Sequence, residues 1–482
     1  MTPAPTTPDR TRWAALAVLC AGTLMIILDG TIVTVALPRI QTDLGLSSGG
    51  LAWVMNAYLI AFGGMLLLAG RLGDLLGPKR VLLAGLALFT TASLLCGLAD
   101  TPALLIGGRL LQGVGGALTA SVSLGMIVNL FTEPRDLRRA FAVYSFVGSA
   151  GASLGLVLGG LLTQELNWHW IFFINVPIGI ATGIPAVRLL DSRPGLGLRR
   201  GADVPGALLV TSGLTLGVYA IVEHGRDAWP AALLLVGFAV RQATAADPLL
   251  PPRILRSRKV AGANLVQGLM VAALFSFQIL IAQYLQHVLG FGPAATGLAM
   301  APSALSIAAF SLGLSARLNT RFGERAVLAA GLLMLVLGLA WLTRAPVHGH
   351  YLPDVLPVTL LAGGFGLAIT AVTTVGMSDA TPADSGLVSG LFNTTQQLGA
   401  ALGVAVTTII AADRSGSLAR GGHSPAAALT GGYRLAFTVD TGLLVAATLA
   451  VALLPGRRAA ADPVAVRAAT AEPRLTPEAP RS

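Results

Sequence analysis

Charged residues are scarce in this chain, and so are the residue types that build most catalytic and metal sites. Only 11% of its 482 residues are charged and its mean hydropathy is +0.75, whereas soluble domains carry about 25% charged residues. The two cysteines, Cys20 and Cys96, provide neither a disulfide framework nor a zinc pattern. A GxxxxGK[S/T] phosphate loop is missing, so ATP is not expected to drive this protein. We therefore predict no cofactor and no metal.

Long hydrophobic runs are what the chain has instead, and they recur from end to end. We predict an all-α polytopic membrane protein, since a β-barrel would show short alternating strands. The span at 229–245 is the weakest because Arg241 interrupts it, although an arginine near a helix end can reach the interface. The fourteen predicted spans are 13–37, 51–70, 81–99, 103–130, 140–163, 170–190, 204–223, 229–245, 260–287, 293–316, 326–344, 353–377, 385–412 and 433–455.

The distribution of basic residues sets the predicted orientation. With fourteen spans, 25 of the 32 Lys and Arg residues fall on the side of both termini and 6 on the other side. The positive-inside rule then places both termini in the cytoplasm of a cell whose plasma membrane the chain crosses many times. The net charge of +10 is explained by these loops, so we expect a lipid bilayer and no nucleic acid as partner.

An internal repeat divides the chain. The stretch 71–86 and the stretch 317–332 share Arg, Leu, Gly, Val, Leu, Ala, Gly and Leu in the same register, 246 residues apart. Parallel six-helix halves around a central site are an alternating-access architecture. The predicted organisation is a cytoplasmic N-terminus (1–12), an N-terminal six-helix bundle (13–190), two inserted helices with basic loops (191–259), a C-terminal six-helix bundle (260–455) and a disordered cytoplasmic tail (456–482).

Asp29 is a lone carboxylate in the middle of the first hydrophobic run. A charged aspartate at a helix centre costs about 2.5–3.5 kcal/mol even on the lenient insertion scale, and its usual use is proton or cation coupling. The alternative is an acid beside an aqueous vestibule or bound to a backbone group. Arg109 is the one basic residue placed deep in a predicted span, where its guanidinium suits either a carboxylate or backbone carbonyls.

Four motifs resemble those of the major facilitator superfamily, and specifically its fourteen-helix drug:proton antiporters. They are LDGTIVTVALP at 28–38, GRLGDLLGPKR at 70–80, RLLQGVGG at 109–116, and the glycine-rich stretch 148–160, which is followed by WHWIFFINVP at 168–177. The resemblance covers nearly all of the chain and implies the major facilitator fold, with two six-helix bundles plus two inserted helices. Two departures are Leu156, next to Gly155 where the family usually has proline, and Thr34, where it usually has asparagine.

The resemblance also implies residue roles. Arg109 would lie near the first helix and tune Asp29 for proton coupling. Asp74, with Arg71 and Gly77, would form a latch between the halves. The antiporter-motif glycines would line the contact between the halves, where small residues allow close helix approach; they are Gly148, Gly151, Gly155 and Gly159. The second copy of the repeat has Thr320 in place of Asp74, so only the N-terminal half carries the acid of the predicted latch.

Other polar residues in the spans leave alternatives open. Asp440 is a secondary acid that either couples protons, pairs with Arg434 or lies at a wet rim, and Glu223 is a boundary residue. Candidate residues of the substrate cavity could equally face other helices; they are Asn56, Tyr58, Gln112, Asn264, Gln267, Gln278, Asn393, Gln396 and Gln397.

The leading functional prediction is a proton-coupled antiporter that exports hydrophobic or amphipathic small molecules, such as drugs or antibiotics, by alternating access. It would act as a monomer. The alternative is a proton-coupled transporter dedicated to one metabolite. An intramembrane enzyme would need several His, Asp or Glu side chains clustered within the spans, and only Asp29 and Asp440 qualify.

Overall fold

The described chain is helical throughout. The computed structural model describes residues 9–131, 133–192, 195, 197, 203–222, 228–245, 248, 249, 252–378, 385–452 and 454, and no strand occurs among them. Within this part, twelve helices or continuous helix groups are long and apolar enough to cross a membrane. Helices α5, with 32 residues, and α9, with 17 residues, are not among these twelve but pack alongside α1 and α8. The prediction of a polytopic all-α protein is confirmed.

The N-terminal half contains six passages. Short turns and capping residues separate them: the side chain of Ser47 accepts a hydrogen bond at the start of α2, that of Thr101 does so at the start of α4, and a proline occupies the first turn of α3, α4 and α5. The helices are α1 (Asp9–Leu44), α2 (Ser48–Leu76), α3 (Pro78–Gly97), α4 (Pro102–Leu130), α5 (Pro134–Glu165), and α6 (Trp170–Phe173) with α7 (Asn175–Leu189), which together form the sixth passage.

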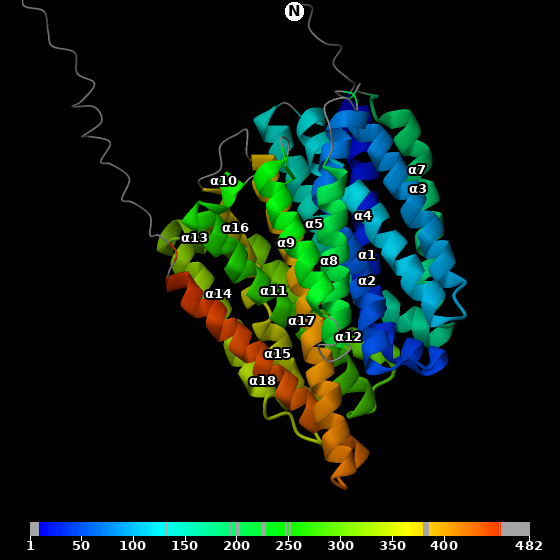
Figure 1. Cartoon of the computed structure of the whole chain (residues 1–482), viewed down its shortest axis with the longest axis vertical. Coiled ribbons are helices and arrows are strands. Elements are labelled where there is room, and N and C mark those ends of the chain that lie inside the picture. Colours follow the sequence, from blue (N-terminus) through cyan, green and yellow to red (C-terminus); the bar gives the residue numbers. More distant parts are fainter. Residues whose placement is uncertain are drawn as a thin grey trace, which may run out of the picture.

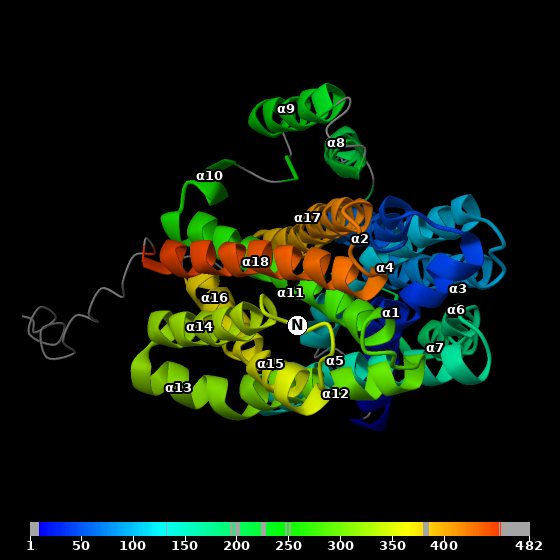
Figure 2. The same ribbon diagram turned by 90° about the horizontal axis from the view of Figure 1, so that it is seen from below.

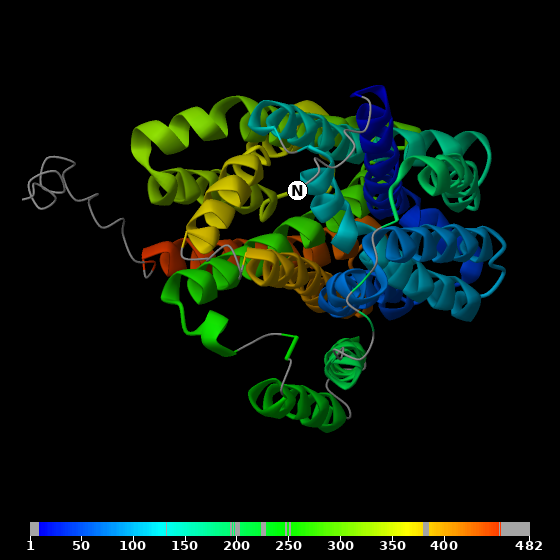
Figure 3. The same cartoon turned by 90° about the horizontal axis from the view of Figure 1, so that it is seen from above.

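Two helices follow that lie outside the bundle, α8 (Val204–Val222) and α9 (Ala228–Thr244). Figures 2 and 3 show them side by side at the edge of the molecule, with α8 next to α2 and α17. Arg241 does not interrupt α9. Its Nε donates to Asp203 Oδ1 over 2.5 Å, and Gln242 Nε2 donates to Asp203 Oδ2 over 2.8 Å, so one carboxylate joins the two helix ends.

The C-terminal half again contains six passages. It follows the short helix α10 (Pro252–Leu255) and comprises α11 (Arg258–His287), α12 (Pro293–Ala309) with η2 (Phe310–Leu314) and α13 (Ser315–Phe322), α14 (Glu324–Leu342), η3 (Tyr351–Val355) with α15 (Leu356–Leu361) and α16 (Gly364–Met377), α17 (Ser385–Arg420) and α18 (Pro425–Ala452). Figure 1 shows that α1 begins at the top of the view and that α18 runs from the bottom toward this side, ending at mid-height. We call this the termini side.

The internal repeat has a structural counterpart. Gly77 separates α2 from α3 with φ of 95° and ψ of 135°, and Gly323 separates α13 from α14 with φ of 80° and ψ of 155°. A positive φ favours glycine because it has no Cβ. Gly77, with Pro78 next to it at the start of α3, therefore turns the chain within one residue, and the second copy makes the same corner at Gly323.

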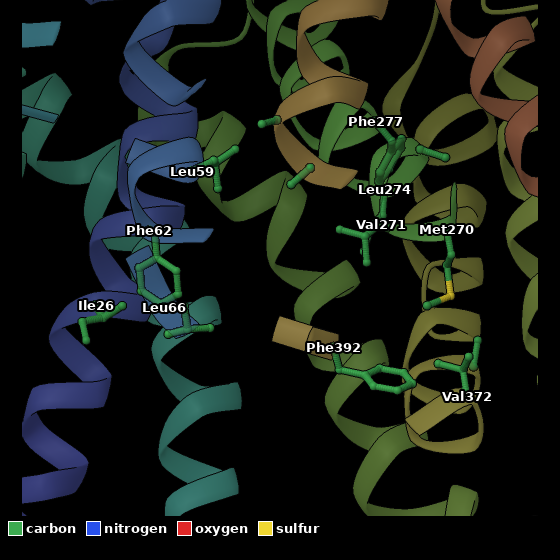
Figure 4. Packing of buried hydrophobic residues seen from close by; sticks show 14 of the residues in the cluster. Ile26, Leu59, Phe62, Leu66, Met270, Val271, Leu274, Phe277, Val372 and Phe392 are labelled. Atoms are coloured by element: carbon green, nitrogen blue, oxygen red, sulfur yellow. The ribbon is translucent and has the colours of Figure 1, made fainter. Parts of the chain in front are cut away.

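Both halves have apolar cores, and they touch each other away from the termini. Figure 4 shows core side chains from α1 and α2 on one side and from α11, α16 and α17 on the other. Across the halves, Gln286 Nε2 donates to the Val35 carbonyl over 3.0 Å, and the Ala294 amide donates to Gln164 Oε1 over 3.2 Å. Both bonds lie toward the side opposite the termini, and a third bond, from Thr394 Oγ1 to the Gly63 carbonyl over 3.3 Å, joins α17 to the middle of α2.

One predicted loop is wrong. The spans were expected to end at 412 and resume at 433, but α17 continues to Arg420 and α18 begins at Pro425. Helix α17 has 36 residues and is therefore about 54 Å long, against about 30 Å for the hydrocarbon core of a bilayer. The two helices extend together beyond the rest of the bundle at the bottom of Figure 1. Their mutual packing, which hydropathy does not record, continues the helices past the apolar segment.

Candidate functional site

Asp29 lies at the centre of a buried polar cluster in the N-terminal half. Its side chain has no exposed surface, and donors from three other side chains surround it. Arg109 Nη1 donates to Oδ2 over 2.5 Å, Gln112 Nε2 donates to Oδ1 over 3.0 Å, and Asn175 Nδ2 donates to Oδ1 over 2.9 Å. The alternative of an aqueous vestibule or a backbone partner for this acid is therefore wrong. It is a buried ion pair with added hydrogen bonds.

Arg109 on α4 is also fully buried. Besides the bond to Asp29, its Nε donates to the Val54 carbonyl over 3.0 Å and its Nη1 lies 2.9 Å from Gln112 Oε1. Its guanidinium carbon lies 4.4 Å from the centroid of the Tyr58 ring. Both partners foreseen for this arginine, a carboxylate and a carbonyl, are thus present. The predicted proximity of Arg109 to the first helix is confirmed.

Gln112 completes the cluster and connects it to α3. Its Nε2 donates to Ser93 Oγ over 2.7 Å, and Ser93 in turn donates to the Phe89 carbonyl over 2.8 Å. Ser93 and Asn175 were not among the candidate residues. A usable signal existed for Asn175, because a polar residue within a predicted span marks a helix contact or a functional site. Ser93 could not be found this way, since serines occur on many helix faces.

The glycine stripe of α5 faces α1 and not the other half. A Cβ at Gly148 or Gly151 would meet Ile27, one at Gly155 would overlap Thr31, and one at Gly159 would overlap the Ile32 carbonyl. The resemblance-based expectation that these glycines line the contact between the halves is thus wrong. The spacing of three and four residues puts them all on one helix face, and this face packs on the helix that carries Asp29.

The contact between α5 and the C-terminal half uses the neighbouring face of α5. A Cβ at Gly160 would reach the backbone of Pro293 and Ala294, and one at Gly297 would overlap the Leu156 carbonyl. Leu156, which occupies the place of the family's usual proline, is itself buried. Helix α5 therefore touches α1 with one face and α12 with the next.

The predicted latch residues lie at the end of α2 on the termini side. Asp74 is exposed and Arg71 is partly buried. Gly77 closes the helix through its amide, which donates to the Gly73 carbonyl over 3.0 Å. The described structure thus shows the corner at Gly77 but brings no group of the other half to Asp74.

The candidate cavity residues separate into three groups. Tyr58 and Gln112 are buried beside the Asp29–Arg109 pair, and Asn56 is buried with no hydrogen-bond partner for its side-chain amide among the described residues. Asn264 and Gln267 are also buried, but they hold helices together, because Thr395 Oγ1 donates to Asn264 Oδ1 and Gln267 Nε2 donates to the Phe392 carbonyl. The third group is at least partly exposed and consists of Gln278, Asn393, Gln396 and Gln397.

Asp440 is neither at a wet rim nor paired with Arg434. It is fully buried on α18 and accepts a hydrogen bond from, or donates one to, Ser276 Oγ at 2.7 Å. Arg434 instead donates to the Ala345 carbonyl over 2.8 Å. The two structural alternatives for this acid, an ion pair with Arg434 and a position at a water-exposed rim, are therefore wrong. Glu223 lies outside the described residues.

Comparison with known proteins places the chain in a family. The sequence model of the Major Facilitator Superfamily matches residues 19–404 and, a second time, residues 263–477. The chain belongs to this superfamily. The second match begins near the start of α11, the first helix of the C-terminal half, as the internal repeat requires.

Individual relatives and a solved structure agree with this assignment. The puromycin resistance protein pur8 of Streptomyces alboniger is 38% identical over 98% of this chain and 96% of its own length. The cephamycin export protein CmcT of Amycolatopsis lactamdurans is 38% identical over 86% of this chain and 88% of its own. The solved structure of the POT family transporter PepTSo shares the fold, with a TM-score of 0.69 at 15% identity over 93% of this chain and 98% of that one.

These findings confirm several predictions. The chain is a multi-pass membrane transporter of small molecules and not an enzyme. The predicted family is confirmed, and the names of both relatives agree with the predicted efflux function.

Proposed function

We propose that this protein exports hydrophobic or amphipathic small molecules, antibiotics among them, across the plasma membrane in exchange for protons. The observation that carries the proton coupling is the buried Asp29–Arg109 ion pair with its bonds from Gln112 and Asn175. An ionised carboxylate inside a membrane is costly and usually functional. Support for the exported class comes from the relatives, one named for puromycin resistance and one for cephamycin export.

In the proposed cycle Asp29 takes up and releases one proton per turnover. Protonation removes the negative charge and leaves the Arg109 guanidinium without its counter-ion, although the Val54 carbonyl and Gln112 still accept from it. Loss of one charge from a buried pair is strongly unfavourable. Helix α1 then shifts against α5, and because α5 also packs on α12 the contact between the halves changes. Substrate and proton thus select opposite conformations.

The proposal includes the organisation of the chain. The two six-helix bundles would be residues 13–190 and 260–455, with residues 191–259 inserted, both termini cytoplasmic, and one copy acting alone. Arg256 and Arg420 are both exposed, on opposite sides of the bundle. Arg420→Cys should react with an impermeant thiol reagent in intact cells, and Arg256→Cys only after permeabilisation. Labelling of position 256 in intact cells would reverse the orientation. The native Cys20 and Cys96 are buried and give little background.

The proton coupling is tested with Asp29→Asn in reconstituted vesicles, using puromycin and a panel of dyes as substrates. The neutral variant should exchange substrate down its gradient but should not accumulate it when a pH gradient is imposed, and substrate addition should release no proton. Wild type and variant are compared at equal amounts of folded protein. Full accumulation by the Asn variant would exclude Asp29 as the coupling group.

A second candidate function is export of a single compound, because both relatives carry the name of one antibiotic. The same vesicle panel separates the two. Accumulation of several unrelated substrates indicates a broad exporter, and accumulation of one indicates a dedicated exporter.

A further inference from the structure

A second carboxylate lies inside the C-terminal half, on the buried stripe of α18. The stripe follows the helical period through Tyr433, Ala436, Phe437, Asp440 and Leu444, all of which are buried. Asp440 itself has no exposed surface. A carboxylate in this position has lost its hydration, so it must be either compensated by donors and cations or neutral.

The hydrogen bonds around Asp440 form a short chain across three helices. Ser276 Oγ on α11 lies 2.7 Å from Asp440 Oδ2 and 2.7 Å from Thr407 Oγ1 on α17, and Thr407 Oγ1 lies 2.7 Å from the Gly403 carbonyl. The serine hydroxyl has one hydrogen and cannot donate to both neighbours. The carbonyl of Gly403 can only accept.

Two directions of donation are possible along this chain. If Asp440 carries a proton on Oδ2, it donates to Ser276, Ser276 donates to Thr407, and Thr407 donates to the Gly403 carbonyl, so that every hydrogen is used. If Asp440 is ionised, Ser276 must donate to it, so the two hydroxyl hydrogens cannot serve all three contacts: either the Ser276–Thr407 or the Thr407–Gly403 contact has no hydrogen, and the charge rests on a single neutral donor. Asp440 Oδ1 has no partner in either case. An unpartnered oxygen is far less costly on a neutral carboxyl than on a charged one.

The helices packed against α18 bring no cation to Asp440. They are α11, α14 and α17. Among their titratable groups, Tyr284 on α11 stacks edge to face with Tyr433, two turns from Asp440, and Arg325 on α14 donates to the carbonyls of Val451 and Ala452 at the far end of α18. The remaining charged groups lie at helix ends: Arg258, Lys259 and His287 on α11, Glu324 on α14, and Asp413, Arg414 and Arg420 on α17. On α18 itself, Arg434 donates to the Ala345 carbonyl.

The position that the repeat relates to Arg109 holds no arginine in the C-terminal half. At the offset of 246 that relates Gly77 to Gly323, Arg109 corresponds to Val355 and Gln112 to Val358, both buried apolar residues. Asp29 corresponds to Phe275, which adjoins Ser276. In both halves the first and the sixth passage thus meet at a polar contact, Asp29 with Asn175 and Ser276 with Asp440. The acid of this contact lies on the first passage in the N-terminal half and on the sixth passage in the C-terminal half.

We propose that Asp440, with Ser276 and Thr407, is a second proton-binding site of the transporter, occupied in the described conformation and released in another. Proton uptake places a hydrogen on Oδ2 and removes the carboxylate charge, and release returns the proton to water. This inference rests on the proposed proton-driven export, because it adds a second proton to the one carried by Asp29.

Occupancy is tested by infrared difference spectroscopy on the full chain. A protonated carboxyl shows a C=O stretch that an ionised one lacks. Wild type at neutral pH should show such a band, Asp440→Asn and Asp440→Ser should lack it, and the control Asp203→Asn should retain it. If the Asp440 variants leave the protonated-carboxyl band unchanged, Asp440 is ionised and the proposal is wrong.

Release of the Asp440 proton is tested by measuring how the limiting substrate accumulation ratio depends on the imposed pH gradient, with the membrane potential clamped. Each exchanged proton multiplies the limiting accumulation ratio about tenfold per pH unit of gradient. Wild type should therefore respond about a hundredfold per unit and Asp440→Asn about tenfold. Equal slopes would mean that the Asp440 proton stays in place and is structural. If wild type shows no accumulation at all, the proposed function fails, while the infrared band still reports the Asp440 proton.

Discussion

The two buried carboxylates of this transporter, Asp29 and Asp440, occupy related places in the two halves but have opposite surroundings. Asp29 accepts from Arg109, Gln112 and Asn175, and so its charge is compensated. Asp440 has one hydroxyl neighbour, and no cation is bonded to it. Buried ionised groups are tolerated when they are paired and hydrogen-bonded, and otherwise they neutralise. The comparison shows that one repeated framework surrounds its buried acid with an arginine and two amides in one half and with a single hydroxyl in the other.

Removal of the arginine should have the largest effect. Arg109→Ala leaves Asp29 buried without its cation, and we expect a loss of about 3–5 kcal/mol in the free energy of unfolding. Denaturant titration in detergent measures this, with the exposed Arg188→Ala as control. The double variant Asp29→Asn/Arg109→Gln should lose less than Arg109→Ala alone. If the loss in unfolding free energy of the double variant equals the sum of the losses of the single variants, the two side chains are not coupled. The contrast between a paired Asp29 and an unpaired Asp440 would then be wrong.

Crowding the helix that carries Asp29 should have the next largest effect. A Cβ at Gly155 would overlap Thr31 and come within 3.0 Å of the Leu28 carbonyl, so Gly155→Ala should displace α1 from α5. We expect a loss of about 1–3 kcal/mol in stability, as for other overpacked contacts, together with a reduced rate of proton-driven transport. Gly183→Ala is the control, because a Cβ there meets nothing within 4 Å. Equal behaviour of the two variants would contradict the close α1–α5 contact.

Removal of Ser276, the hydrogen-bond partner of Asp440, tests the contrast between the two acids in the C-terminal half. Ser276→Ala leaves the carboxyl without a hydrogen bond and should cost about 1–3 kcal/mol. Because Asp440 is neutral in the proposed state, the loss should be smaller than that of Arg109→Ala. The control is Ser303→Ala, whose hydroxyl donates to the Met300 carbonyl of its own helix. A loss as large as that of Arg109→Ala would indicate that Asp440 is charged.

Asp203, another acid with several hydrogen-bond partners, lies outside the membrane-spanning segments and should matter least. Burial alone would raise its pKa, but hydrogen bonds from Arg241, Gln242 and the Gly206 amide, with the Arg241 charge, lower it. Since the pKa is lower in the folded than in the unfolded chain, the stabilisation is present above the unfolded value of about 3.9 and is lost as the pH falls through the folded value.

For Asp203→Asn we expect a loss of about 0.5–1 kcal/mol at neutral pH, because Arg241 is 41% exposed and solvent weakens the pair. The difference from wild type should disappear in acid, and proton-driven accumulation should not change. Unfolding titrations at neutral and acidic pH measure it. A difference that persists below the folded pKa would show that the effect is not due to the carboxylate charge.

Much of this protein could be predicted from its residues alone. Hydrophobic runs predict the helices because a bilayer leaves the backbone no other way to satisfy its hydrogen bonds. The repeat of 71–86 at 317–332 predicts two halves, and the same sharp corner occurs at Gly77 and Gly323. Asp29 and Arg109 could be singled out for the same reason, since a charge within a hydrophobic run is costly wherever the chain places it.

The partners of those charges were decided only by the tertiary structure. Asn175 and Ser93 join the Asp29 cluster because α3 and α7 pack beside α1 and α4, and no spacing along the chain expresses that packing. Likewise, the period of the α5 glycines shows that they share a face, but only the position of α1 shows what the face touches. The two acids look alike in the sequence. What distinguishes them is whether a neighbouring helix supplies an arginine, and helix packing alone determines that.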